Sequence, residues 1–134
     1  MKWTLEVVVV PVSDVDRAKQ FYADKLGFNV DFDMTVDADN RVVQLTPRGS
    51  GCSIAIGYGV VPAMPPGSLK GLQLVVPDVL AARAELLERG VEVSELKVFG
   101  ENHGPGGELD NVGFVFFSDP DGNSWGVQQI SYDR

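Results

Sequence analysis

The chain has 134 residues, of which 44% are hydrophobic and 22% are charged. This balance is typical of one folded domain and excludes wholesale disorder. Eleven Lys and Arg residues against 19 Asp and Glu residues give a net charge of −8, which argues against a nucleic-acid partner and mildly favours cationic ligands. No apolar stretch could span a membrane and the N-terminus has no secretory pattern, so we expect a cytoplasmic protein.

The first half of the chain is predicted to form a strand, a helix and three further strands. Residues 5–12 are apolar on both parities, as in a strand covered on both faces. Asp14 is placed to cap a helix with an apolar face at three- and four-residue spacing, and Gly27 is placed to end it. Three short strands are expected next, near 28–34, 40–46 and 52–57.

The same order of elements is predicted after a connector. Residues 58–70 carry three prolines and two glycines and predict an irregular link. A strand is then expected at 72–76, followed by a helix that Asp78 caps and Gly90 ends. The remaining expected elements are a strand opening at 91–93, a Gly-rich loop at 100–107, a strand at 112–117, a turn at 119–123 and a last strand at 124–130.

The two halves form an internal repeat. Six residues recur in order: Asp14 with Asp78, Val15 with Val79, Ala18 with Ala82, Gly27 with Gly90, Pro47 with Pro120, and Gly49 with Gly122. This pattern predicts an α+β fold of two βαβββ modules that form a curved mixed sheet around a cleft. We expect a single domain over 1–134, with module one at 1–60, the connector at 58–70 and module two at 70–134.

Two segments carry a family resemblance: PVSDVDRAKQFYADKLGF at 11–28 and FFSDPDGNSWGVQQ at 116–129. They resemble the vicinal oxygen chelate superfamily, which includes glyoxalase I, extradiol dioxygenases, fosfomycin-modifying enzymes and bleomycin-resistance proteins. The resemblance spans essentially the whole chain and includes the repeat. In the resistance members two chains commonly form the clefts together, so the resemblance also implies a homodimer.

Enzymes of this superfamily usually hold one divalent metal through His, Glu or Gln side chains. The resemblance places the four ligand positions at Val7, Ser53, Gly71 and Gly126. Val and Gly side chains offer a metal no lone pair, so we expect a chain without a metal or other cofactor. Rescue of a metal site by Glu6 or Gln44 stays open as an alternative.

The lining of the cleft follows from strand parity. The expected binding residues are Val7, Val9, Ser53, Ala55, Gly71, Gln73, Gly126 and Gln128. They would make small and apolar walls with a few amides, and the two glycines would leave room for a larger guest.

A lid over the cleft is a second expectation. The segment around His103, Gly104 and Gly106 is the candidate, and His103 is either a general base there or a solvated loop residue. Cys52 has no His or Lys near it in the sequence and is interpreted as a small core residue.

These observations favour a metal-free binding protein of the bleomycin-resistance type, which sequesters a hydrophobic or aromatic small molecule. The rival hypothesis is a lyase, isomerase or dioxygenase, with a displaced metal or with His103, Glu6 or Glu108 as acid or base. A third is a scaffold whose cleft is filled by its own side chains. Ionisable groups that converge in the cleft would favour the enzyme, whereas an apolar aromatic lining would favour sequestration.

Overall fold

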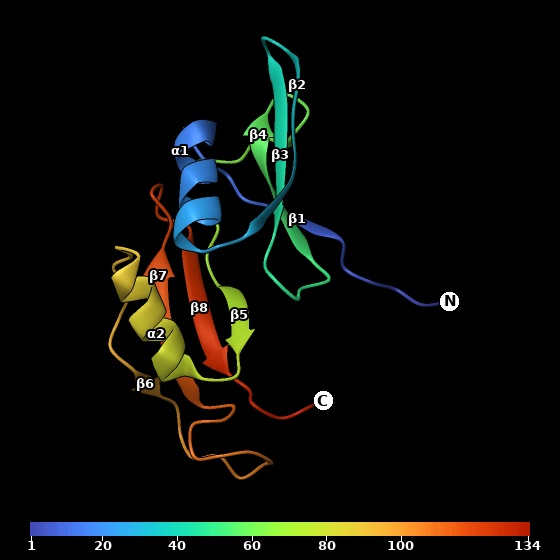
Figure 1. The fold of residues 1–134 in the computed structure, drawn as a ribbon. Helices are drawn as coiled ribbons and strands as arrows, with labels where there is room; N and C mark the ends of the chain where they lie inside the picture. The colour runs from blue at the N-terminus through green and yellow to red at the C-terminus, as the bar shows by residue number, and fades with distance from the viewer. The chain divides into compact units, whose positions relative to one another are not determined.

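The computed structural model describes residues 1–134 and divides them into two compact units. Unit 1 comprises Met1–Leu69 with Asp119–Asn123, and unit 2 comprises Lys70–Ser118 with Ser124–Arg134. Each unit contains one four-stranded mixed sheet and one main helix (Figure 1). The predicted α+β class with two βαβββ modules is therefore confirmed. No helix combines the length and the apolar character needed to span a bilayer.

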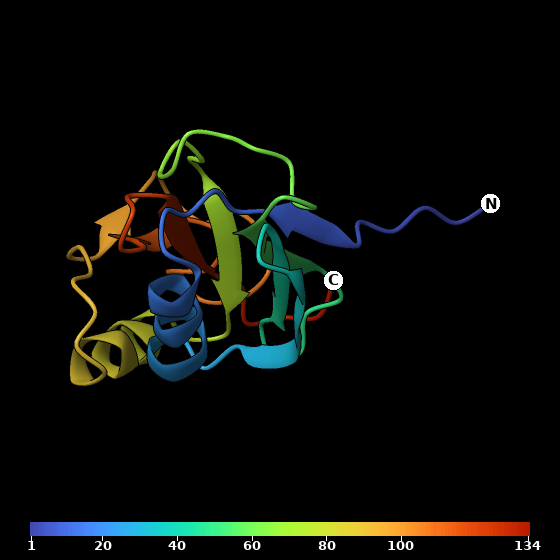
Figure 2. The same ribbon diagram turned by 90° about the horizontal axis from the view of Figure 1, so that it is seen from above.

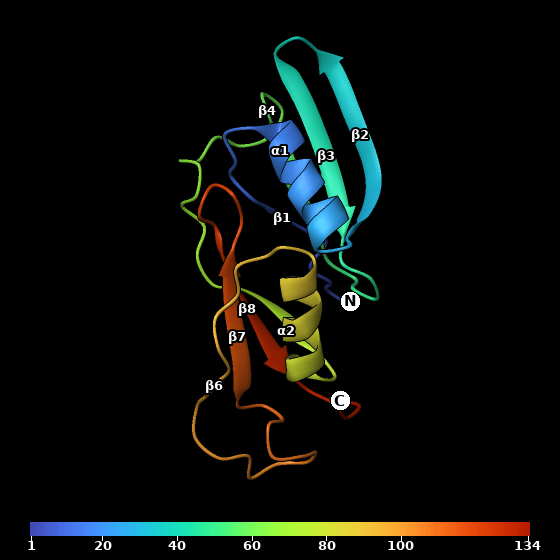
Figure 3. The same cartoon turned by 60° about the vertical axis from the view of Figure 1, so that its left-hand side comes forward.

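Unit 1 follows the predicted order of elements. They are β1 (Val7–Val9), α1 (Val15–Gln20) with a π-helical turn η1 (Phe21–Lys25), β2 (Asn29–Asp37), β3 (Asn40–Thr46) and β4 (Ser53–Tyr58). The strand order is β1-β4-β3-β2, with β1 parallel to β4 and the other pairs antiparallel. Helix α1 covers one face of this sheet (Figure 3), where Val43, Leu45 and Ile56 are fully buried.

Unit 2 repeats this arrangement. Its elements are β5 (Leu72–Val76), α2 (Val79–Glu88), β6 (Lys97–Val98), β7 (Gly113–Ser118) and β8 (Ser124–Gln129). The strand order β5-β8-β7-β6, with β5 parallel to β8, matches that of unit 1. Helix α2 contacts β7 and β8, and the buried side of their sheet includes Val115, Trp125 and Val127. The opposite face of the sheet carries the candidate site.

The sequence repeat has a backbone counterpart at both helices. Asp14 and Asp78 are N-caps with similar extended conformations, and each carboxylate accepts the N–H three residues on at 3.0 Å. Gly27 and Gly90 follow the helix ends with φ of 73° and 81°, in the left-handed region that glycine adopts without strain. The predicted caps and stops of both helices are therefore confirmed.

The first strand is shorter than the predicted span of 5–12. Backbone pairing with β4 begins where Ser53 N–H donates to the carbonyl of Glu6, and residues 1–6 are exposed. They extend away from β1 in Figure 2. Val7 is 38% exposed, so the expectation of a strand covered on both faces was wrong for this unit taken alone.

The strand expected to open at 91–93 is also absent. Val93 forms only one isolated bridge, to Phe117, and the strand β6 lies four residues further on. The reason is Ser94, whose Oγ accepts the N–H of Phe116 at 2.9 Å in place of a strand carbonyl. A side chain thus takes over a hydrogen bond of the expected ladder.

The turn at 119–123 connects two strands of unit 2 but belongs to unit 1. Within the turn, Asp119 Oδ1 accepts the N–H groups of Asp121 and Asn123. Its Oδ2 accepts the hydroxyl of Tyr22 at 2.7 Å, and the Asn123 amide donates to the carbonyl of Pro11 at 2.8 Å. The carboxylate of Asp119 is therefore a buried structural acceptor.

Candidate functional site

On the open face of the unit 2 sheet, residues of β5, β8 and β7 form two rows that cross the strands. Register places Gln73 beside Gly126 and Gly126 beside Phe116, which makes the first row. In the next row, Val75 lies beside Gln128, which lies beside Phe114. Strand alternation turns all these residues away from the buried core.

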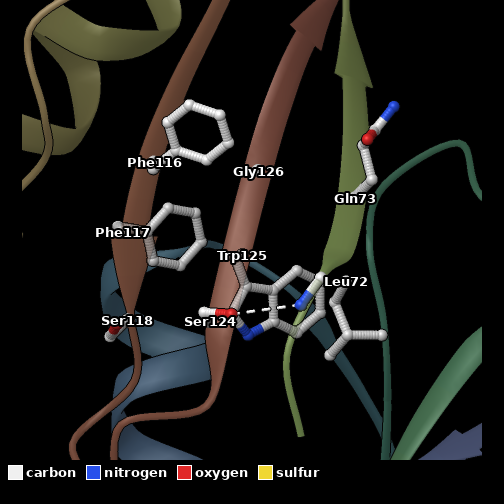
Figure 4. Close-up of a pocket in the computed structure, with 9 residues that line it drawn as sticks. Leu72, Gln73, Phe116, Phe117, Ser118, Ser124, Trp125 and Gly126 are labelled. Atoms are coloured by element: carbon white, nitrogen blue, oxygen red, sulfur yellow. Dashed lines mark hydrogen bonds between the residues drawn. The ribbon is translucent and has the colours of Figure 1, made fainter.

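A groove of about 300 Å³ includes the first row and continues past it toward Gly71, Ser118 and Ser124 (Figure 4). It is lined by Gly71, Leu72, Gln73, Phe116, Phe117, Ser118, Ser124, Trp125 and Gly126. Gly71 N–H donates to Ser124 Oγ at 3.0 Å, and this hydrogen bond joins the segment before β5 to the start of β8. None of the lining residues is ionisable, so the groove offers apolar surface and neutral hydrogen-bonding groups.

Three phenylalanines form an aromatic wall beside the groove. Phe114 and Phe116 are stacked, with ring centroids 5.9 Å apart, and Phe99 meets both rings edge-on at 5.5 and 6.3 Å. Phe99 is 60% exposed and Phe116 is 39% exposed. Exposed aromatic side chains that are grouped in this way are typical of interaction surfaces, so this wall belongs to the candidate site.

Two glutamines form an amide chain across the face. Gln73 Nε2 donates to Gln128 Oε1 at 2.7 Å, and Gln128 Nε2 donates to the backbone carbonyl of Asn111 at 2.8 Å. The chain anchors both side chains and orients the amide of Gln73 at the edge of the groove. Together with Ser118 and Ser124 it supplies the polar groups of a largely apolar surface.

Unit 1 holds the other four predicted binding residues on its own sheet. Val7 pairs with Ser53 and Val9 pairs with Ala55, across β1 and β4. Ser53 and Ala55 are buried, whereas Val7 and Val9 are partly exposed. These four residues are thus neighbours.

A polar cluster adjoins these residues in unit 1. Thr46 Oγ1 lies 2.6 Å from Ser53 Oγ and donates to Asp31, and Gln44 Nε2 donates to the same carboxylate at 3.1 Å. The hydrogen bonds from Thr46, Gln44 and Asn29 hold the pKa of Asp31 below its ordinary value. Asp31 is therefore a well-satisfied carboxylate.

The predicted binding residues therefore form two sets. Gly71, Gln73 and Gly126 line the groove of unit 2, and Gln128 joins them through its hydrogen bond to Gln73. The other set, in unit 1, surrounds the β1–β4 pair. Whether both sets face one cavity stays a prediction.

The residues present do not fit the divalent metal of the related enzymes. Val7, Gly71 and Gly126 have no donor atom, and the hydroxyl of Ser53 is engaged by Thr46. The Gln44 amide donates to Asp31, and no three His, Cys, Asp or Glu side chains are grouped as metal ligands.

The predicted lid is a loop held mainly by polar contacts. The Asn102 amide donates to the carbonyls of Pro105 and Gly107 at 3.0 and 2.7 Å, and Gly106 has φ of 93°. A Cβ at Gly106 would lie 2.3 Å from Asp110 Oδ2, which explains this glycine. The side chain of His103 is 84% exposed and lies 3.9 Å from Glu101. This geometry agrees with a solvated loop histidine.

The aromatic wall is absent from the predicted lining. Phe114 and Phe116 are two residues apart on β7 and therefore share one face of the sheet. The pairing of Phe116 with Gly126 could have been predicted from the sequence, because counting outward from the 119–123 turn pairs Ser118 with Ser124 and hence Phe116 with Gly126. No sequence pattern indicates Phe99, because it follows β6, which was expected at 91–93 and lies at Lys97–Val98.

The comparisons with known proteins agree with this fold. The family model described as "Glyoxalase/Bleomycin resistance protein/Dioxygenase superfamily" matches residues 4–127. TnmS3, an antibiotic binding protein from Streptomyces sp. CB03234, is 38% identical over 96% of each chain, with a TM-score of 0.73. A glyoxalase/bleomycin resistance protein from the same organism is 39% identical over 94% of this chain and 100% of that one, with a TM-score of 0.71.

A third solved structure extends the likeness to another organism. A superfamily member from Sphaerobacter thermophilus DSM 20745 is 28% identical over 96% of this chain and 98% of that one, with a TM-score of 0.76. A comparison with curated proteins gave no match. The family match covers most of the chain, so the protein belongs to the glyoxalase/bleomycin resistance protein/dioxygenase superfamily.

Proposed function

We propose that this protein is a metal-free binding protein that sequesters a hydrophobic or aromatic small molecule. The observation that carries the proposal is the groove of unit 2, with an aromatic wall on one side, an anchored amide on the other and no ionisable group in its lining. Apolar burial at about 25 cal/mol per Å² would drive binding, and the amide would orient the guest.

The description of TnmS3 as an antibiotic binding protein supports the same class of function. An antibiotic-like aromatic compound is therefore the kind of guest we propose. The acidic surface, with a net charge of −8, would favour a guest that carries positive charge.

Catalysis by acid and base is less well supported. It requires ionisable groups that converge on bound substrate. The groove lining contains none, and the candidate base His103 lies on an exposed loop, 3.9 Å from Glu101.

The proposal includes a cytoplasmic homodimer and a chain that behaves as a single domain. Its support is the family resemblance and the exposure of apolar residues on the open faces of both sheets, among them Val7 and Phe116. A second copy would cover part of this apolar surface.

The test is an NMR titration of the ¹⁵N-labelled protein with 2-naphthol, a small fused aromatic probe, in the presence of EDTA. We expect saturable shifts centred on Gln73, Phe116 and Gly126, and a rotational correlation time appropriate to a dimer. Shifts that never saturate, or that centre on another part of the chain, would refute the groove as the site. Binding that EDTA abolishes would refute the metal-free mechanism.

A further inference from the structure

We propose that the amide oxygen of Gln73 selects ligands that carry a hydrogen-bond donor on the edge of an aromatic ring system. The inference deepens the proposed function and rests on it. It concerns Gln73 Oε1, which accepts no hydrogen bond from the protein while the nitrogen of the same amide is engaged.

The direction of the amide chain is fixed at its far end. The backbone carbonyl of Asn111 can only accept, so the group of Gln128 that faces it at 2.8 Å must be the NH₂. Gln128 Oε1 then faces Gln73, which must present its own NH₂ at 2.7 Å. The only arrangement that satisfies both contacts leaves the Gln73 oxygen for a ligand.

The anchor at Asn111 is itself held in place. Its N–H donates to the carbonyl of Gln129 at 2.8 Å, and its side-chain amide donates to Asn102 Oδ1 at 3.0 Å. The hydroxyl of Tyr132 donates to Asn111 Oδ1 at 2.5 Å. With these contacts the carbonyl that orients the chain is preorganised before a ligand arrives.

The position of Gln73 makes its oxygen decisive for selectivity. It flanks Gly126, with Phe116 on the other side, so a flat guest on this row has the phenylalanine rings at one edge and the amide at the other. In the free protein, water satisfies the exposed oxygen. A guest that covers the amide removes that water, and a guest without a donor leaves the acceptor unpaired.

The recognised class is therefore a planar aromatic molecule with a peripheral hydroxyl or N–H group. Two parts of this face recognise different features of the guest. The phenylalanine wall accepts any flat apolar surface. Gln73 Oε1 discriminates between guests of the same shape by the presence of a donor.

The test compares 2-naphthol with 2-methoxynaphthalene, which has the same ring system but lacks the donor, by isothermal titration calorimetry. For the unmodified protein we expect 2-naphthol to bind about three- to tenfold more tightly, the worth of one neutral hydrogen bond. Gln73→Met should bring this ratio close to one. The matched control is Gln20→Met, which makes the same chemical change at an exposed position on α1 and should keep the ratio.

A second variant tests the orienting chain. Gln128→Met removes the partner of the Gln73 amide, which can then present either its oxygen or its nitrogen. The preference for 2-naphthol should shrink but not vanish.

A third probe, protonated 2-naphthylmethylamine, carries a charged donor. Added salt weakens a charged attraction and leaves a neutral hydrogen bond unchanged, so the effect of salt on the affinity distinguishes the two kinds of donor.

The outcomes separate this inference from the proposed function. Equal binding of both naphthalene probes, with NMR shifts centred on the groove, would overturn the role of Gln73 and leave sequestration standing. A preference for 2-naphthol that survives Gln73→Met would overturn it as well. Failure of every probe to bind would refute the proposed function and this inference with it.

Discussion

The site depends on a missing side chain as much as on the aromatic rings around it. Gly126 is buried beneath the ring of Phe116, its cross-strand neighbour. A Cβ built at this glycine would lie 3.2 Å from Phe116 Cε1 and 3.4 Å from Cδ1. A larger residue would therefore push the ring out of place and fill the floor of the groove.

Gly126→Val is expected to weaken the binding of 2-naphthol by about tenfold or more, because the guest loses both space and a well-placed ring. Calorimetric titration measures the loss, with circular dichroism to verify that the variant is folded. The matched control is Gly51→Val, where a Cβ meets no heavy atom within 4 Å. Undiminished binding to Gly126→Val would mean that the guest lies elsewhere.

How much of the site the sequence reveals depends on the range of each contact. Parity along a single strand was enough to place Gly71, Gln73 and Gly126 together, and all three line one groove of unit 2; their role in binding stays a prediction. The hydrogen bond from Gln73 to Gln128 and the position of Phe99 depend on how separate segments meet, which a local pattern does not encode. Alternation shows which face a residue occupies but not which groups it touches there.

At the scale of elements, local chemistry specifies the helices better than the strands. Each helix has its own cap and stop within the segment, so the repeat could be predicted in detail. The region at 91–93 has the composition of a strand, yet the competing hydroxyl of Ser94 decides its structure. The π-helical turn at Phe21–Lys25 also had no signal in the apolar spacing.

The paired caps allow a direct test of this local control. Asp14→Ala and Asp78→Ala should each lower the free energy of unfolding by about 0.5–2 kcal/mol, since each leaves a first-turn N–H without its acceptor. Urea denaturation followed by circular dichroism measures the change. Asp24→Ala, a change of the same type outside the caps, should be close to neutral. If neither cap variant lost more stability than Asp24→Ala, the role of Asp14 and Asp78 as stabilising caps would be contradicted.

At the scale of the whole molecule, some of the excess acidic residues stabilise the fold. In unit 1, Asp33 accepts two hydrogen bonds from Arg41 and one from Lys19, and these hold its pKa far below the ordinary value of 3.8. In unit 2, hydrogen bonds from Ser131 and then Gly107 lower the pKa of Asp110. Each unit therefore contains a carboxylate that the fold prefers in its charged form.

These lowered pKa values set the acid limit of the fold. A carboxylate with a folded pKa below its unfolded pKa stabilises the protein fully above the ordinary value, and this contribution is lost as the pH falls toward the folded value. The melting temperature should therefore stay nearly constant from about pH 7 to about pH 5 and fall below about pH 4. Differential scanning calorimetry across this range measures it.

The variant Asp33→Asn tests how much of the loss of stability in acid comes from a single carboxylate. It should lower the melting temperature at neutral pH, because Arg41 and Lys19 lose their charged partner, and it should make the decline in acid shallower. Asp133→Asn, near the end of the chain, is the matched control and should leave both features unchanged. A loss of stability already between about pH 7 and about pH 5 would contradict this assignment, because the carboxylates with lowered pKa values titrate only in more acidic solution.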